Sequence, residues 1–175
     1  CTQLAAHYQT LWVPEYAREY LETNGTSYTY DTLLEIAKGQ VRLEDEYLER
    51  LKADHPDKSH PVEADTTQNL SAHPLLFIDT EMYVMKVWSE FVFRKCHQWI
   101  IDQAADRQYD LFLLCNIDLP WIYDVLREYP TPEPRQQLFR MYHDIMVNQP
   151  VPWVIIKGDY EDRLSSAIAA INRIL

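Results

Sequence analysis

Acidic and basic side chains follow directly after short apolar runs of this chain. In the clearest case, the strand-like run at residues 75–78 ends in Asp79, followed by Thr80, Glu81 and a long amphipathic stretch. A carboxylate at the carboxyl end of a buried parallel strand faces the crevice where α/β proteins bind ligands, and in nucleotide-handling folds it helps to hold a magnesium ion. Phosphoryl transfer is therefore the leading hypothesis for the chemistry.

Three further clusters of charged and aromatic side chains follow the apolar runs at residues 11–14, 109–117 and 153–156. Taken singly, each has a plain structural explanation, because acids are favoured in the first turn of a helix and at its N-cap. In an open parallel sheet, however, all strand carboxyl ends line one crevice, so the combination favours a site. The side chains concerned are Glu15, Arg18 and Glu19, then Asp118, Asp124 and Arg127, and finally Asp159, Tyr160 and Arg163.

Apolar runs alternate with helical periodicity along the chain, a pattern typical of parallel βαβ units. The four runs predict strands at 11–14, 75–79, 109–117 and 153–156. Helices are expected at 1–8, 15–22, 29–53, 81–105, 135–147 and 160–175, with a short helix within 116–127. Residues 54–74 carry three prolines and many charges without apolar periodicity, so an exposed loop is expected there.

Composition restricts the class of protein. The 175 residues, 47% of them hydrophobic, suffice for one sizeable core, so residues 1–175 are expected to form a single domain. A net charge of −11 argues against a nucleic-acid or membrane-surface binder, because an acidic field repels polyphosphates and anionic lipids. Three widely spaced cysteines suggest neither a disulfide framework nor a zinc site, which favours a reducing cytoplasm.

Four short strings carry a resemblance to a known family. VPEYARE at 13–19, FIDTE at 77–81, WIYDVLRE at 121–128 and PWVII at 152–156 resemble, in this order, the ribosylnicotinamide kinase domain of NadR-type proteins and the related small AAA-type ATPases. The resemblance implies a three-layer α/β P-loop NTPase fold of the nucleoside-kinase kind, with a parallel sheet flanked by helices. It also implies ATP and Mg²⁺ as cofactors, and phosphorylation of nicotinamide riboside to nicotinamide mononucleotide in NAD biosynthesis.

The same resemblance implies a role for individual residues. Asp79 matches the acid that orients magnesium or accepts the hydroxyl proton, and Arg127 matches the arginine of a mobile lid. The implied catalytic residues are Asp79, Arg127 and Arg18; the implied substrate-binding residues are Glu15, Glu81, Asp124 and Trp121; and the implied nucleotide-binding residues are Arg135, Tyr160 and Arg163. The family often has aspartate where Glu81 stands and a small residue or proline where Val125 stands, so details of the acceptor site and lid can differ.

One element of the family pattern is absent from the sequence. It contains no GxxxxGK[ST] loop, and its only glycines are Gly25, Gly39 and Gly158. In this fold the strand before that loop lies between the runs at 75–79 and 109–117. Its loss would leave two rows of buried backbone groups unpaired, at roughly 1–3 kcal/mol each, which a marginal stability of about 5–15 kcal/mol cannot absorb. We therefore expect the gene to encode a strand and phosphate loop before residue 1.

Three classes of function stay open at this point. The first is a small-molecule kinase acting on a nucleoside. The second is an ATP-binding regulatory or interaction module without nucleoside kinase activity, and the third is a scaffold protein with a degenerate nucleotide site. The acceptor, a homo-oligomeric state and a preceding adenylyltransferase domain are likewise open.

Overall fold

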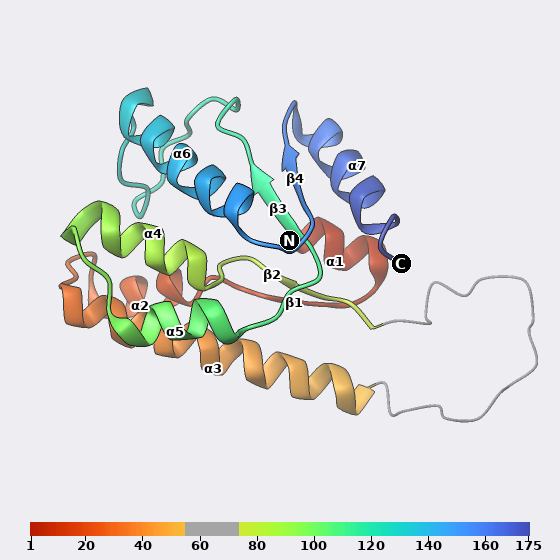
Figure 1. Ribbon diagram of the computed structural model, residues 1–175, viewed down its shortest axis with the longest axis horizontal. Helices are drawn as coiled ribbons and strands as arrows, with labels where there is room; N and C mark the ends of the chain where they lie inside the picture. The colour runs from red at the N-terminus through yellow and green to blue at the C-terminus, as the bar shows by residue number, and fades with distance from the viewer. Residues whose placement is uncertain (55–73) are drawn as a thin grey trace, which may run out of the picture.

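The computed structural model describes residues 1–54 and 74–175. Its helices and strands alternate along the chain, except that two consecutive helices precede β2 and two precede β3 (Figure 1). In chain order the elements are α1 (Thr2–Tyr8), β1 (Leu11–Val13), α2 (Tyr16–Asn24), α3 (Tyr30–Asp54), β2 (Leu76–Ile78), α4 (Met82–Phe93), α5 (Gln98–Asp106), β3 (Phe112–Cys115), α6 (Pro132–Asn148), β4 (Trp153–Ile156) and α7 (Tyr160–Ile171).

The strands form two small parallel sheets. Strand β1 pairs with β2, with Val13 opposite Ile78, and β3 pairs with β4, with Cys115 opposite Ile156. Both registers place the carboxyl ends of the paired strands level with each other. The predicted single open sheet is thus present as two parallel pairs within the described residues.

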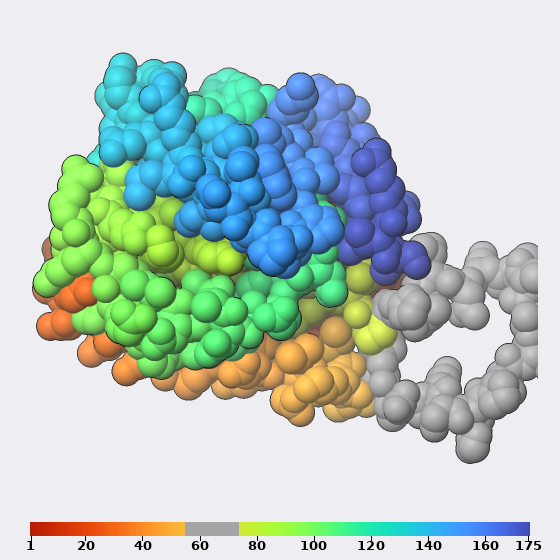
Figure 2. All heavy atoms as spheres, viewed as in Figure 1, coloured from red at the N-terminus to blue at the C-terminus, as the bar shows by residue number. Residues whose placement is uncertain are grey.

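Two apolar clusters hold the helices against these strands. Helices α1 and α7 pack on one cluster, which includes Leu4, Ile156 and Ile171 and is bordered by side chains from β2 and β3. Helices α3, α4 and α5 enclose the other, which is built around Ile36, Met82 and Ile100. Helix α6 packs against α4 and β3, and Figure 2 shows its side chains lying over the α4 surface. The helices therefore flank the sheets, as predicted.

Several predicted elements agree closely with the structure and two do not. The strand at 153–156 is confirmed, and the helix predicted at 29–53 is α3. The single helix predicted at 81–105 is wrong, because the chain breaks into α4 and α5. Arg94 adopts a left-handed conformation with φ 58°, and the Ser89 hydroxyl donates to the Lys95 carbonyl at 2.8 Å, which stabilises the corner.

The short helix predicted within 116–127 is also wrong. This segment runs from β3 to α6 without a helix before Pro132. Pro120 lacks a backbone donor, and the Asp124 carboxylate accepts from the backbone N–H of Leu126 at 2.9 Å, a local bond that competes with helical pairing.

The predicted exposed loop at 54–74 lies almost wholly outside the described residues. No helix among the described residues is long and apolar enough to cross a membrane.

Gly39 lets α2 lie close against the middle of α3. A Cβ built on Gly39 would stand 1.9 Å from Cε1 of Tyr16. Adding a methyl group to a packed contact costs about 1–3 kcal/mol, whereas alanine gains roughly 1 kcal/mol over glycine inside a helix. We expect Gly39→Ala to lower the free energy of unfolding, measured in urea. In a Tyr16→Leu background the same change should become neutral or stabilising, and a gain in stability with Tyr16 present would contradict this packing.

Candidate functional site at the carboxyl ends of the strands

The first part of the site is the turn between β1 and α2. Glu15 is the N-cap of α2, and its side chain makes no capping bond. Arg18 lies one helical turn further, and its guanidinium is 4.0 Å from the Glu15 carboxylate and 3.7 Å from that of Glu22. These side chains are about half exposed, so they border an open surface rather than the core.

The loop between β3 and α6, residues 116–131, crosses toward this turn. Nη2 of Arg18 donates to Oδ2 of Asp124 at 3.1 Å. Partial burial raises the pKa of Glu15, with Arg18 and Arg127 opposing the shift while the carboxylates of Asp79 and Asp124 add to it. Of the six charged residues predicted for catalysis and acceptor binding, Arg18, Asp79, Asp124 and Arg127 therefore lie close enough to Glu15 to act on its carboxyl group, and Glu81 does not contribute.

Asp79 lies at the carboxyl end of β2, level with the start of this turn. Its backbone N–H donates to the carbonyl of Val13 at 3.1 Å, which continues the β1–β2 ladder by one residue. Its carboxylate is exposed and has no hydrogen-bond or ion-pair partner among the described residues. The described residues contain no cluster of three or more metal-binding side chains. A single free carboxylate nevertheless suits Mg²⁺, which is commonly held by one or two carboxylates together with substrate phosphates.

Glu81 occupies a different environment from Asp79. It is the N-cap of α4, and its carboxylate accepts from the backbone N–H groups of Tyr83 at 2.6 Å and Val84 at 3.2 Å. Burial raises the pKa of Glu81 to about 8, although the two backbone bonds oppose the shift. Its geometry is that of a helix cap, and the substrate contact expected for it stays a prediction.

The loops after β3 and β4 are joined by Arg163. Its guanidinium donates to the carbonyls of Gly158 at 2.9 Å and Asn116 at 3.0 Å, and it pairs with the Asp118 carboxylate. Asp118 also accepts from the Gly158 backbone N–H at 2.7 Å. Sequence reasoning placed Asp118 in a cluster but gave it no role. The sequence signal for the pair was the position of Asp118 three residues after β3, together with that of Arg163 in the first turn of α7.

The remaining predicted residues lie nearby with different surroundings. Arg135 donates to the carbonyls of Ile117 and Leu119 at 3.2 and 3.3 Å, so it orders the start of the 116–131 loop. Trp121 packs edge-on against Tyr123, with 6.0 Å between ring centroids. Tyr160 is 62% exposed at the first turn of α7 and is therefore open to a ligand.

Charged groups that follow strands of both pairs act on the Cys115 thiol. Desolvation raises its pKa, while the charges of Arg163 and the Cys1 amino group lower it and that of Asp79 raises it. Asp79 after β2 and Arg163 after β4 thus act on one atom at the end of β3. The carboxyl ends of β2, β3 and β4 therefore lie near one another, with Cys1, the N-cap of α1, close by.

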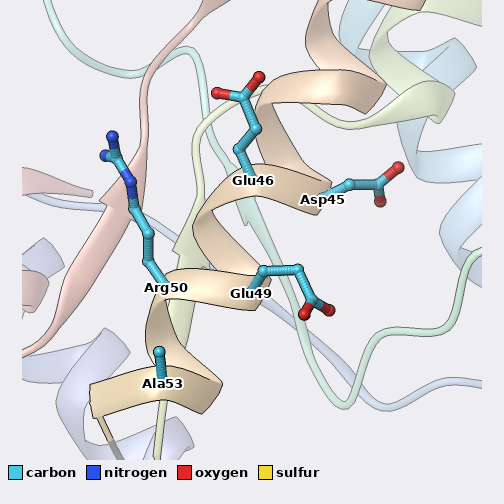
Figure 3. Close-up of a pocket in the computed structure, with 5 residues that line it drawn as sticks. All are labelled: Asp45, Glu46, Glu49, Arg50 and Ala53. Atoms are coloured by element: carbon cyan, nitrogen blue, oxygen red, sulfur yellow. The ribbon is translucent and has the colours of Figure 1, made fainter.

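Two hollows on the surface differ in their relation to this edge. One runs along α3, and Figure 3 shows that its lining side chains from Asp45 to Ala53 all come from that helix and point in different directions. It has no convergent polar groups. The other lies between the α2–α3 connection, the end of α4 and the 116–131 loop. Its lining includes Leu21, Ser27, Tyr28, Phe93, Val125 and Glu128.

The fold and the site define an α/β domain with small parallel sheets between helices and with charged groups gathered at the strand carboxyl ends. A family model described as AAA domain (AAA_28) matches residues 1–163, so the chain belongs to this AAA domain family. It is also similar to the crystal structure of NadR protein in complex with NAD and AMP-PNP, with a TM-score of 0.66 and 20% sequence identity. The match covers 99% of this chain and 44% of that one, so this chain spans less than half of the NadR chain.

Proposed function

We propose that this protein transfers a phosphoryl group from ATP to a small nucleoside, with nicotinamide riboside as acceptor and nicotinamide mononucleotide as product. The observation that carries the proposal is the pairing of Arg18 with Glu15 and Asp124, which joins the turn after β1 to the loop after β3, with Asp79 and Arg127 close enough to act on the Glu15 carboxyl group. Membership of the AAA domain family supports nucleotide binding. The similar NadR structure was solved with AMP-PNP, an ATP analogue.

The side chains divide into roles that suit this chemistry. Asp79 would hold Mg²⁺, which neutralises charge on the transferring phosphoryl group when bound. Arg18 and Arg127 supply fixed positive charge where negative charge develops. Glu15, Glu81, Asp124 and Trp121 would bind the acceptor. The hollow lined by Ser27, Phe93 and Val125 has the mixed polar and apolar lining that a nucleoside requires.

The nucleotide is assigned to the opposite end of the crevice. Arg163 and Arg135 bind the backbone carbonyls of the loops after β3 and β4, and in doing so they shape the surface on which a nucleotide base would lie. Exposed Tyr160 would contact the base directly. These three residues therefore serve the donor nucleotide, while the Glu15 turn serves the acceptor.

The proposal includes a further strand between β2 and β3 that carries the phosphate loop. Strand β2 hydrogen-bonds to β1 and β3 to β4, yet the two inner strands border the same apolar cluster through Phe77 and Leu113. The rings of Tyr83 after β2 and Phe112 in β3 are 5.6 Å apart between centroids. One parallel strand in this position would satisfy the inner edges of both pairs and would deliver a loop to the crevice.

A nucleoside panel tests the proposed activity. The full-length protein is incubated with ATP and Mg²⁺ and each nucleoside in turn, and 5′-phosphate products are separated by chromatography. We expect nicotinamide riboside to be converted faster than the common ribonucleosides. ATP binding without phosphorylation of any nucleoside would instead identify a regulatory module and refute the kinase assignment.

A further inference from the structure

Within residues 1–54 and 74–175, three turns lead from a strand into a helix that begins with an acidic N-cap. At α4 the N-cap Glu81 accepts from two backbone N–H groups of its own helix, and at α7 Asp159 does the same with Glu161 and Asp162. At α2 the N-cap Glu15 makes no such bond. Some other group must therefore support the first turn of α2.

That group is Gln40 of α3, which is only 1% exposed. Its Oε1 accepts from the backbone N–H of Tyr16 at 2.8 Å, and its Nε2 donates to the carbonyl of Pro14 at 3.4 Å. A buried primary amide is costly unless it is hydrogen-bonded. Both of its polar atoms bind the backbone on either side of Glu15, so Gln40 bridges the turn.

The neighbouring residue fixes the same turn by packing. Gly39 leaves room for the Tyr16 ring to lie directly on α3. Adjacent residues of one helix therefore hold the start of α2 at two points, one polar and one steric. In the sequence, the signal for this contact is the Gly39–Gln40 pair within the predicted helix at 29–53, and we did not single it out. In the structure both residues are buried.

We propose that Gln40 is a positioning residue, which clamps the β1–α2 turn so that the Glu15 carboxylate is not used as a helix cap and stays beside Arg18 at the site. The inference rests on the proposed function for the role of Glu15 in acceptor binding, but the clamp itself is independent of any reaction. Without Gln40, the first turn of α2 would lack its external acceptor. The Glu15 carboxylate, as the side chain at the N-cap position, would then be available to cap its own helix, as Glu81 and Asp159 do.

Gln40→Met tests the clamp, because methionine keeps the length of the side chain and removes both polar atoms. In the full-length protein we expect the Tyr16 amide to exchange with solvent at least about tenfold faster, measured by NMR, since an intact buried hydrogen bond is lost. Gln137→Met, on the exposed face of α6, is the matched control and should leave that rate unchanged. An unchanged Tyr16 rate in Gln40→Met would refute the clamp.

The link to Glu15 is tested by a double-mutant cycle with nicotinamide riboside as the probe. In the wild-type background, we expect Gln40→Met to weaken the affinity of the protein for nicotinamide riboside about tenfold. In a Glu15→Gln background, we expect the same substitution to have almost no effect on that affinity. Equal losses in both backgrounds would show a merely structural role and overturn the positioning assignment. If wild-type protein does not bind the riboside, the proposed function fails, while the amide-exchange result still decides whether the clamp exists.

Discussion

Asp79→Asn is expected to lower the rate of phosphoryl transfer by about 10²–10⁴-fold, the range typical of a positioned acid–base group. Asparagine keeps the size of the side chain but removes the negative charge that would hold Mg²⁺ and the basic oxygen that would accept a proton. Because the Asp79 carboxylate is exposed and has no partner among the described residues, the substitution should leave the unfolding temperature almost unchanged. Rate is measured as nucleoside 5′-phosphate formed at saturating ATP.

Asp110→Asn is the matched control for this experiment. Asp110 is also exposed and lies just before β3, at the opposite end of the strands from Asp79. It should retain full activity, because only carboxyl ends of parallel strands face the crevice. Equal activity of Asp79→Asn and wild-type protein would remove Asp79 from the site.

Arg107→Met should destabilise the fold by about 3–5 kcal/mol, the cost of removing one partner of a buried ion pair. Nε of Arg107 lies 2.9 Å from Oε2 of Glu44, and the two side chains are 18% and 2% exposed. The other oxygen of Glu44 is buried without a hydrogen-bond partner among the described residues. Without the guanidinium, a buried carboxylate would be left with only the Tyr109 hydroxyl, which donates at 3.1 Å.

The loss of folding stability caused by Arg107→Met should also depend on pH. Burial already raises the pKa of Glu44, with Arg107 opposing the shift, and the substitution raises it further. A carboxyl group whose pKa is raised by folding favours the folded state below its unfolded pKa and loses that contribution as pH rises. The deficit of Arg107→Met relative to wild type should therefore be larger at pH 8 than at pH 5.

Urea unfolding at both pH values measures this effect. Arg42→Met, on the exposed surface of the same α3 helix, is the control and should change stability by less than about 0.5 kcal/mol. A deficit for Arg107→Met no larger than that of the control would mean that the buried pair contributes nothing to folding.

Local patterns in the sequence determined some elements and left others open. Strand β4 lies between clear turn signals, and α3 has a regular apolar face, so both could be predicted closely. The break between α4 and α5 could not, because it depends on a left-handed Arg94 and on the Ser89–Lys95 bond rather than on a glycine or proline. Hydrophobic periodicity continues across this corner and gives no sign of it.

The site shows the same division. The position of charged residues after strands was enough to predict that Glu15, Asp79 and Asp124 lie near one another, because parallel strands end at one edge, and the charges of Asp79 and Asp124 both act on the Glu15 carboxyl group. The hydrogen-bond partner of each side chain could not be predicted, because it depends on tertiary contacts that the spacing of residues in the sequence does not show. Glu81 caps a helix, Arg163 joins two loops, and Gln40, a residue of α3 with no charge, supports the turn that presents Glu15.

The proposed function requires a magnesium nucleotide to bind at the carboxyl ends of β1, β2, β3 and β4. NMR titration of the full-length protein with Mg²⁺ and a non-hydrolysable ATP analogue tests it most directly, since backbone amide shifts report the place of binding residue by residue. We expect the largest shifts at Asp79 and Gly158 and in the 116–131 loop, including Asn116. Shifts confined to the exposed surface of α3, or no shifts at millimolar nucleotide, would contradict it.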